Sequence, residues 1–330
     1  MNPTSFRTCA FVAYDDGPVR TIDPVARAAG ARLVDTSAYG DSVEAWRAWL
    51  SAQRPPVLVC GTSASIPGIA TEMAARRAAA HLGIPVACIE DFPGNYAEVA
   101  AAPTRLLIVE SGWSRDLYLA RGHASPIAVI SPVRYDALRG QPVACAAARA
   151  PYEVLWAGQP ETAHNVATLE WVLRALRTLA PTVLFRAHPR DPGVARGAYA
   201  PFAALLGERW IDVSAEPLAV TLAREFPLVV TQFSSVAVEA GFLGIPSLHV
   251  LLASAGGGAL KTMKGYDTPA ICAAGAAFLA RDNTPPADVV AALTDETARQ
   301  TVIARFVEAY RTDTPTLPMV MAALAGIIPR

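Results

Sequence analysis

The stretch from Thr182 to Val250 contains two apolar segments, and polar residues follow each of them directly. The first segment reads TVLFRAHPR over 182–190, and the second reads LVVTQFSSVAVEA over 228–240, followed by LGIP at 243–246. Both have the composition of buried parallel strands. Because the carboxyl ends of neighbouring parallel strands face one crevice, we expect the polar residues after them to converge on a ligand.

The residue types at these two strand ends favour an anionic ligand. A strand that ends at Ser234-Ser235 and continues as a helix offers backbone N–H groups, a positive helix end and two hydroxyls to a phosphate. Arg186 and His188, the latter followed by Pro189, add further donors. The alternative is that Ser234 only caps a helix and that His188-Pro189 only ends a strand.

Composition narrows the class of protein. A length of 330 residues predicts two domains, and 52% hydrophobic with 17% charged residues indicates a globular chain. The formal net charge of -1 argues against a nucleic-acid partner, so a local cluster has to hold any anion. The N-terminus lacks the apolar core of a secretory signal, and the five scattered cysteines resemble buried hydrophobes in a reducing compartment. We therefore expect a cytoplasmic protein.

The segment at 317–328 is apolar nearly throughout. It is too short for a transmembrane segment, which needs about 20 residues. We expect a terminal helix packed at the domain junction. The alternative is peripheral membrane association, although the segment lacks the Lys/Arg face typical of such helices.

Apolar runs alternate with Ala-rich helical stretches almost from end to end, which predicts an α/β protein with two parallel sheets of about six strands. The strand candidates are 9–14, 32–35, 57–60, 86–90, 106–110 and 127–130, then 154–157, 183–187, 210–213, 228–231, 247–251 and 277–279. Helices are expected at 70–82, 165–179 and 297–310.

Residues 141–151 contain two prolines and lack periodicity, which is typical of an interdomain linker. The predicted domains are therefore 1–140 and 152–330, with a last helix that can pack back on the first domain. The two halves resemble each other, because CGTS at 60–63 leads through a helix to LGIP much as TQFSS at 231–235 does. This similarity favours two Rossmann-like domains that face each other across a cleft.

The two domains, the His-Pro after a strand and the Ser-Ser unit with its Leu-Gly-Ile-Pro ending together resemble the GT-B glycosyltransferases and their relatives. The most similar groups are bacterial capsule-type and sialic-acid-type transferases and the non-hydrolysing UDP-N-acetylglucosamine 2-epimerases. The resemblance implies a GT-B-like fold with a C-terminal helix at the domain junction. It also implies that the first domain binds the acceptor and that the second binds the nucleotide donor.

In the sialic-acid and capsule transferases, an acidic-acidic-Gly motif supplies the catalytic base, and His-Pro and Ser-Ser hold a cytidine nucleotide. Here Asp15-Asp16 precedes a glycine directly after the first predicted strand. The resemblance implies that Asp15 or Asp16 deprotonates an acceptor hydroxyl, while His188, Ser234 and Ser235 stabilise the departing phosphate. In many sialic-acid transferases the motif lies later in the domain, and an ordinary Asp-Gly turn is the alternative.

A second acidic candidate is EDFPGNY at 90–96, at the end of the strand after the first LGIP. In the epimerases the corresponding strand ends in Glu-Ala-Gly and supplies acid/base groups, and a Gly-Asp stands where this chain has GTS at 61–63. The missing acid, and Ser-Ser at 234–235 in place of Ser-Gly-Gly, favour transfer over epimerisation. Glu90 and Asp91 either line the acceptor pocket and assist catalysis or form a strand-end turn. The acceptor-binding candidates are Gly61, Thr62, Ser63, Asn95 and Tyr96.

The nucleotide site has two further candidate elements. Gly158-Gln159 follows the first strand of the second domain, where GT-B proteins often place a turn under the phosphates, and the alternative is a plain turn. Glu239 can hold a ribose hydroxyl or only interact with a helix dipole. The nucleotide-binding candidates are Gly158, Gln159, Arg186, His188, Pro189, Gln232, Ser234, Ser235 and Glu239, and the catalytic candidates are Asp15, Asp16, Glu90, Asp91 and His188.

These features predict an inverting, metal-independent glycosyltransferase that moves a sugar from a CMP- or UDP-linked donor to a saccharide or related acceptor, in surface polysaccharide or glycoconjugate biosynthesis. No metal-ligand spacing appears, so we expect no metal and no cofactor besides the nucleotide-sugar substrate. One alternative is an NDP-sugar 2-epimerase or hydrolase on the same fold. Another is a non-catalytic nucleotide-binding scaffold module. The sequence makes no prediction of the oligomeric state.

Overall fold

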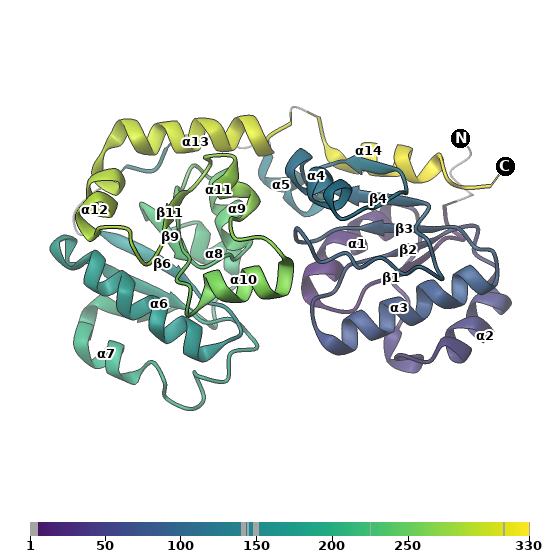
Figure 1. Cartoon of the computed structure of the whole chain (residues 1–330), viewed down its shortest axis with the longest axis horizontal. Helices are drawn as coiled ribbons and strands as arrows, with labels where there is room; N and C mark the ends of the chain where they lie inside the picture. The colour runs from purple at the N-terminus through teal and green to yellow at the C-terminus, as the bar shows by residue number, and fades with distance from the viewer. Residues whose placement is uncertain are drawn as a thin grey trace. The chain divides into compact units, whose positions relative to one another are not determined.

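The computed structural model describes residues 6–139, 143, 145–147, 152–224, 226–312 and 314–329. The chain forms two compact units (Figure 1). Unit 1 comprises Met1–Arg139 and Thr312–Arg330, and unit 2 comprises Gly140–Arg311. The linker expected at 141–151 lies mostly outside the described residues. The last segment was predicted within the second domain, with a last helix able to pack back on the first, and it belongs to unit 1.

Unit 1 contains a five-stranded parallel sheet in the order β1-β2-β3-β4-β5. Its strands are β1 (Ala10–Val12), β2 (Leu58–Cys60), β3 (Val86–Ile89), β4 (Leu106–Val109) and β5 (Ile127–Val129). The strand expected at 32–35 is wrong, because only Leu33 forms an isolated bridge, to Phe11. Arg32 and Asp35 are not buried, so this segment lacks the buried apolar run that a strand of a covered sheet needs.

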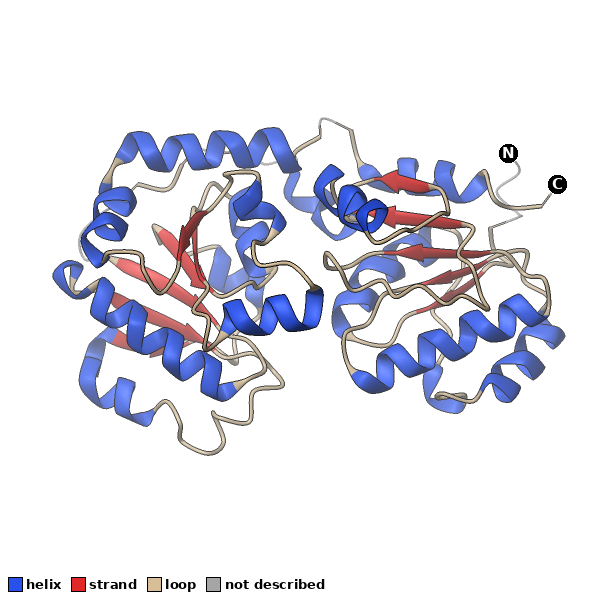
Figure 2. Cartoon of the chain, in the orientation of Figure 1, coloured by secondary structure: helices blue, strands red, loops and turns tan. Residues whose placement is uncertain are grey.

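Helices cover both faces of this sheet (Figure 2). They are α1 (Asp16–Ala28), α2 (Val43–Gln53), α3 (Ile66–His81), α4 (Gly112–Ala120), α5 (Asp136–Arg139) and α14 (Thr316–Ala325), with 3-10 turns η2 (Thr36–Ala38) and η3 (Val133–Tyr135). Phe11 packs with α1 and α14 on one face, and Val12 packs with α2 and α3 on the other. Successive strand residues point to opposite faces, so each strand is apolar throughout.

The last helix, α14, completes the core of unit 1. Val320 and Leu324 are almost fully buried and pack in the same cluster as Ile22 and Val25 of α1. Its N-terminus is satisfied by Asp136, whose carboxylate accepts hydrogen bonds from the backbone N–H of Thr316 and Leu317 and from the Thr316 hydroxyl. Within the described part of the chain, no helix combines the length and apolar character that crossing a membrane requires.

Unit 2 contains a six-stranded parallel sheet in the order β11-β10-β9-β6-β7-β8. Its strands are β6 (Glu153–Ala157), β7 (Thr182–Arg186), β8 (Trp210–Asp212), β9 (Leu228–Thr231), β10 (Ser247–Val250) and β11 (Phe278–Ala280), as the sequence predicts to within a residue or two. From β6 the chain adds β7 and β8 on one side of the sheet. It then returns to add β9, β10 and β11 on the other side. The carboxyl end of β6 beside β9 is therefore the topological switch point, where doubly wound sheets bind ligands.

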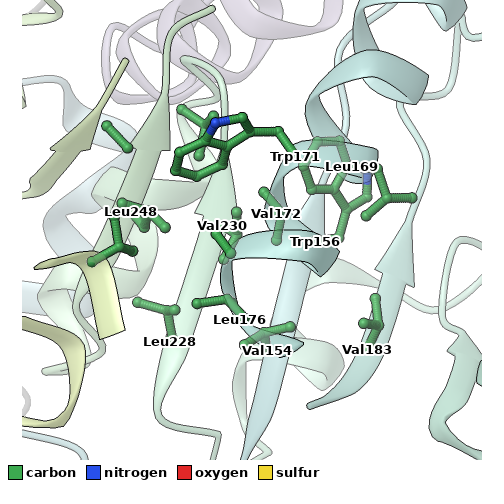
Figure 3. Packing of buried hydrophobic residues seen from close by; sticks show 14 of the residues in the cluster. Val154, Trp156, Leu169, Trp171, Val172, Leu176, Val183, Leu228, Val230 and Leu248 are labelled. Carbon is green, nitrogen blue, oxygen red and sulfur yellow. The ribbon is translucent and has the colours of Figure 1, made fainter. Parts of the chain in front are cut away.

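The helices of unit 2 are α6 (Thr162–Ala175), α7 (Ala200–Leu206), α8 (Leu218–Leu222), α9 (Val236–Phe242), α10 (Gly256–Lys264), α11 (Ala270–Ala273), α12 (Pro286–Thr294) and α13 (Glu296–Tyr310), with 3-10 turns η4 (Arg177–Leu179) and η5 (Gly207–Arg209). Figure 3 shows the main core, in which Trp156 and Val230 of the sheet meet Leu169 and Val172 of α6. This packing fixes the first turn of α6 against the carboxyl ends of the strands. The α/β class with two parallel sheets is confirmed.

Candidate functional site

The register of unit 2 places three strand ends in one row. Ala157 at the end of β6 is aligned with Arg186 of β7 on one side and with Thr231 of β9 on the other. The segments that carry His188 and Ser234 therefore follow strands that flank β6 and do not pair with each other. The turn after β6 lies between them.

The turn after β6 lies against the backbone at His188. The Gly158 N–H donates to the Arg186 carbonyl oxygen at 3.0 Å. A Cβ placed on Gly158 would lie 3.4 Å from the backbone nitrogen of His188 and 3.5 Å from the side-chain nitrogen of Asn165. The predicted nucleotide-site elements Gly158 and His188 are therefore close neighbours.

One buried amide, Asn165 in the first turns of α6, links three strand-end turns. Its Oδ1 accepts from the Gln159 N–H at 2.9 Å and from Gln232 Nε2 at 3.0 Å. Its Nδ2 donates to the Gln159 carbonyl oxygen at 2.6 Å and to Asp191 Oδ2 at 2.9 Å. Asn165 was not among the site residues predicted from the sequence. The available signal was a polar residue on the buried face of a helix that follows the first strand of the unit.

Asp191 joins this network from the loop after β7. Its carboxylate accepts from Asn165, from the Gly193 N–H at 2.8 Å, and from the hydroxyls of Thr162 and Tyr199. Burial raises the pKa of Asp191, but the hydrogen bonds from Thr162 and Tyr199 outweigh it and hold the pKa below its ordinary value. Asp191 is therefore a charged, fully hydrogen-bonded group that orders this loop.

His188 has a defined tautomer in the neutral state. Its backbone oxygen accepts from the Asp191 N–H at 2.9 Å, and its Nδ1 accepts from the Arg190 N–H at 3.1 Å. Since Nδ1 is an acceptor, the ring proton of the neutral imidazole lies on Nε2. The half-buried ring can thus present an N–H donor.

Arg186, a nucleotide-binding candidate, holds a loop of its own unit. Its Nη1 donates to the Glu216 carbonyl oxygen at 2.7 Å and to the Val213 carbonyl oxygen at 3.2 Å. The guanidinium group therefore fixes the connection between β8 and α8. Pro189 lies exposed beside His188.

The Ser-Ser segment is part of the turn after β9. The Ser234 N–H donates to Thr231 Oγ1 at 3.2 Å, and Ser234 Oγ accepts from the Val236 N–H at 3.3 Å. Ser235 is the N-cap residue of α9, and its side chain makes no capping hydrogen bond. Both serines are half-buried, whereas Glu239 in α9 is buried. Ser234 therefore takes part in the turn before α9, and the N-cap position that the sequence suggested for it belongs to Ser235.

His249 of β10 fixes the backbone at Gln232. Its Nδ1 lies 2.9 Å from the Gln232 carbonyl oxygen, and burial lowers the pKa of His249 to about 4. The imidazole is therefore neutral at pH 7. The His249 side chain therefore holds the backbone of the turn after β9 in place.

In unit 1, the adjacent acids Asp15 and Asp16 lie in different environments. Asp15 Oδ2 accepts from the backbone N–H of Ala64 and Ser65 at 2.9 and 2.8 Å, and its Oδ1 accepts from Ser65 Oγ at 2.6 Å. Asp15 therefore connects the turn after β1 to the turn after β2. Asp16 is exposed in the first turn of α1, and its carboxylate has no hydrogen-bond partner among the described residues.

Glu72 of α3 is a buried acid that the sequence analysis missed. Its Oε2 accepts from the Ser63 N–H at 2.7 Å, and its Oε1 accepts from Ser63 Oγ at 2.7 Å and from the Tyr14 N–H at 3.3 Å. Burial raises the pKa of Glu72 to about 7, although these hydrogen bonds oppose the shift. The signal was its helical spacing from buried Ala75 and Ala79, which places position 72 on the core face.

Glu90 and Asp91 follow β3 and are both buried. Glu90 accepts from the Gly94 N–H at 3.0 Å and from the hydroxyls of Ser114 and Tyr118, and burial raises its pKa to about 7. Both of its carboxylate oxygens are thus occupied by groups of the protein.

Asp91 links two of the acceptor-side candidates, Thr62 and Asn95. Its Oδ1 accepts from Thr62 Oγ1 at 2.8 Å and from Asn95 Nδ2 at 3.1 Å. Burial raises the pKa of Asp91, and the positive charge of Arg134 opposes this shift. Its Oδ2 lies against the start of α1, where a Cβ on Gly17 would approach it to 2.5 Å. Only glycine at position 17 allows this contact.

Glu110 follows β4 and is buried without a hydrogen-bond partner for its carboxyl group among the described residues. Burial raises the pKa of Glu110 to about 8, with a further contribution from the charge of Glu90. The neighbouring Arg134 donates through Nη2 to the Asp91 carbonyl oxygen at 2.8 Å. The sequence analysis placed Glu110 at the end of a strand and gave it no role.

The structure thus brings together part of the predicted acceptor site. Ser63 joins Asp15 and Glu72, and Thr62 and Asn95 join Asp91. Tyr96 belongs to a different network, in which its hydroxyl contacts Thr104, Arg76 and Glu98. Gly61 packs in the β2 turn, where its N–H donates to the Val12 carbonyl oxygen at 2.8 Å.

Two further features of the structure concern the site. Among the residues that the structure describes, no group of three or more His, Cys, Asp or Glu side chains has an arrangement that could hold a metal ion. A hollow of about 490 Å³ lies elsewhere on unit 1 and includes Val43, Ile66, Ile69 and Met73 in its lining. None of the candidate residues lines this hollow.

Solved structures share this fold over most of their length. A Listeria monocytogenes protein assigned as a UDP-N-acetylglucosamine 2-epimerase is similar with a TM-score of 0.64 and 14% sequence identity, over 96% of this chain and 95% of its own. The Methanocaldococcus jannaschii UDP-GlcNAc 2-epimerase in complex with UDP-GlcNAc and UDP gives 0.59 and 12%, over 96% and 99%. CalG4, the calicheamicin glycosyltransferase, gives 0.55 and 15%, over 97% and 99%.

No family model matches the sequence, and no curated protein matches it in sequence. The likeness to solved structures is therefore one of fold. It agrees with the two parallel sheets covered by helices. This chain has the GT-B-type fold that these epimerases and this glycosyltransferase share.

Proposed function

We propose that the chain is an enzyme that uses a nucleotide sugar and holds the nucleotide in unit 2. The observation that carries the proposal is the network in which Asn165 joins the turns after β6, β7 and β9 at the topological switch point. Ligands of doubly wound sheets bind at this position. A protein of the same fold was solved with UDP-GlcNAc and UDP, which supports a nucleotide as the ligand class.

In this proposal the nucleotide is bound by side-chain hydrogen-bond donors and by backbone dipoles. The His188 Nε2–H and the hydroxyls of Ser234 and Ser235 contact the phosphates, and the turn at Gly158-Gln159 lies beneath them. Gln232 orients the turn after β9, and Glu239 accepts from a ribose hydroxyl. We leave Arg186 out because its guanidinium group is already used by backbone carbonyls at 213 and 216. Such preorganised donors stabilise a departing phosphate without a metal ion.

The reaction we propose is inverting glycosyl transfer to a saccharide or related acceptor. A carboxylate takes the proton of an acceptor hydroxyl as its oxygen bonds to the anomeric carbon, and the bond from that carbon to the phosphate oxygen breaks. The nucleotide leaves with the electron pair, and one displacement inverts the configuration. Asp16 is the preferred base because it is exposed and has no described hydrogen-bond partner. Asp15 then orders the turn beside it.

The biological setting we propose is surface polysaccharide or glycoconjugate biosynthesis in the cytoplasm, with a CMP- or UDP-linked donor. Five free cysteines in the chain favour a reducing compartment. No cofactor besides the donor substrate is part of the proposal.

A second candidate function is epimerisation or hydrolysis of the nucleotide sugar. Five of the similar structures are assigned as UDP-N-acetylglucosamine 2-epimerases. In addition, burial raises the pKa of Glu110 to about 8 and that of Glu90 to about 7, near the values that suit acid/base exchange at neutral pH. Epimerisation and hydrolysis need no saccharide acceptor, whereas glycosyl transfer does. An assay without acceptor therefore distinguishes the two candidate functions.

The proposal is tested by thermal unfolding with CMP, UDP and GDP, followed by incubation of the matching nucleotide sugars with and without a saccharide mixture. A bound nucleotide raises the melting temperature, by linkage. Inverted glycoside formed only with acceptor supports transfer, whereas a 2-epimer or free nucleotide formed without acceptor supports the second candidate. A folded protein that binds none of the three nucleotides contradicts both.

A further inference from the structure

We propose that Asn165 is the positioning residue of the nucleotide site in unit 2, an inference that rests on the proposed function. Asn165 is fully buried, with 0% of its surface exposed, so it does not touch a ligand. Its role is to hold the turns after β6, β7 and β9 at fixed separations. The geometry of these three turns then sets the affinity for the nucleotide.

The hydrogen bonds of Asn165 define its orientation without ambiguity. The Gln159 N–H must donate, so the atom facing it is Oδ1, and the Asp191 carboxylate must accept, so the atom facing it is Nδ2. With Gln232 Nε2 on Oδ1 and the Gln159 carbonyl oxygen on Nδ2, two donor hydrogens and two acceptor positions are all used. Such a saturated buried amide tolerates little displacement of its partners.

Each partner of Asn165 belongs to a turn that carries proposed ligand contacts. Gln159 follows Gly158, whose N–H bonds the Arg186 carbonyl oxygen. Asp191 bonds the His188 carbonyl oxygen through its backbone N–H. Gln232 lies two residues before Ser234. A change at position 165 therefore moves groups from three strands that contribute to one site.

Other side chains at this position fail for defined reasons. Aspartate has acceptors only, so it cannot donate to the Gln159 carbonyl oxygen and it places a second carboxylate beside Asp191. A leucine would leave the backbone groups of Gln159 and the amide of Gln232 without partners in a buried region. Asparagine has the donor and acceptor pair that this position requires.

The test compares the wild-type protein with Asn165→Asp, with Asp191→Asn and with the double variant, in which donor and acceptor exchange places. The matched control is Thr168→Val, which removes a fully buried hydroxyl of the same helix that has no hydrogen-bond partner among the described residues. Dissociation constants for CMP, UDP and GDP are measured by calorimetry at a temperature where every variant is folded. Melting temperatures are measured in parallel.

We expect N165D to weaken the affinity for the nucleotide that wild type binds by about tenfold or more, and T168V to leave it unchanged. The double variant should recover the part of the loss that comes from the two facing carboxylates, since the amide introduced at position 191 can donate to the carboxylate introduced at position 165. The Gln159 carbonyl oxygen still lacks its donor in this variant, so the recovery should be partial. If N165D is not folded, the neutral variant Asn165→Ser takes its place in the same comparison.

The outcomes separate this inference from the proposed function. A wild-type protein that binds none of the nucleotides overturns both. A wild-type protein that binds a nucleotide, together with an N165D variant that melts at a lower temperature but binds with unchanged affinity, overturns only the positioning role. An affinity loss in N165D without recovery in the double variant overturns the assigned pairing with Asp191.

Discussion

Glu72 Oε2 accepts a hydrogen bond of 2.7 Å from the Ser63 N–H. This bond connects helix α3 to the turn that follows strand β2. The acid is buried, and burial raises its pKa from 4.5 to about 7. In the unfolded chain the carboxyl group of Glu72 has a pKa near its ordinary value of 4.5. The folded state therefore binds the proton more tightly than the unfolded state does between these two pH values.

We predict that this carboxyl makes the free energy of unfolding fall as pH rises from about 4.5 to 7, and that its contribution is constant above that range. Glu72→Gln removes this contribution, so the difference in stability between variant and wild type should become more favourable to the variant as pH rises. Urea unfolding at a series of pH values from about 5 to 8 measures it. A difference that is independent of pH would show that Glu72 ionises in the folded state as it does in the unfolded chain.

Glu110 gives a second prediction with its own pH range. Its raised pKa of about 8 means that the folded protein holds it neutral at pH 7 and has to ionise it by about pH 9. Glu110→Gln has the same shape without the charge. The variant should therefore gain melting temperature relative to wild type as pH rises from about 4.5 to 8, and the difference should be constant above that range.

The control for this comparison is Glu44→Gln, a change at a position of α2 that is not buried. Its melting temperature relative to wild type should stay nearly constant over the same range. If E110Q and E44Q respond alike to pH, the carboxyl of Glu110 is solvated and the buried assignment fails.

The sequence was sufficient for the class of fold but not for the positions of most site residues. Strands such as β7 and β9, with Val183–Phe185 and Val229–Val230 at their centres, are apolar on both faces because the sheet is covered on both sides, and this pattern is visible in the chain itself. Residues 32–35 contain two apolar residues in a row, yet neighbours that are not buried limit them to one bridge.

The positions of the site residues depend on contacts between residues that are distant in sequence. Local sequence patterns do not predict such contacts. Asn165 and Glu72 lie within helices and looked like ordinary helical residues, although each satisfies backbone N–H groups of strand-end turns. Conversely, Arg186 was predicted to bind the nucleotide because it is a cation at the end of a strand. In the structure its guanidinium group donates to backbone carbonyl oxygens of the loop after β8. The sequence pattern predicts where a strand ends. The direction of a side chain at that end, and its hydrogen-bond partners, depend on tertiary packing.

The adjacent acids Asp15 and Asp16 should separate stability from activity. Asp15→Asn replaces an acceptor that receives two backbone N–H bonds and one hydroxyl bond, so we predict a loss of about 1–3 kcal/mol of folding stability. Asp16→Asn changes an exposed residue, so stability should stay within about 0.5 kcal/mol. As the proposed base, however, its loss should lower kcat for glycosyl transfer by roughly 100-fold or more.

Melting curves and transfer rates for both variants check this pair of expectations. Full activity in a folded D16N protein would remove Asp16 as the base and would turn attention to Asp91. Equal loss of stability in the two variants would contradict the separate environments that the structure gives them.

Gly17 at the start of α1 allows the closest approach of that helix to Asp91. A Cβ at position 17 would lie 2.5 Å from Asp91 Oδ2, so Gly17→Ala has to displace the carboxylate from Thr62 and Asn95. We predict that this change costs about 1–3 kcal/mol of stability. The matched control is Gly112→Ala at the start of α4, where a Cβ meets nothing within 4 Å. There the reduced freedom of the unfolded chain should leave stability unchanged or raise it by about 0.4–1 kcal/mol.

A double-mutant cycle shows whether the cost at position 17 comes from Asp91 itself. Asp91→Ala removes the oxygen that the new methyl group would meet, so G17A should cost much less in the D91A protein than in wild type. Chemical unfolding of the four proteins gives the coupling free energy. A cost for G17A that is the same in both backgrounds would place its origin in the backbone of α1. A G17A protein as stable as G112A would contradict the contact between this helix and Asp91.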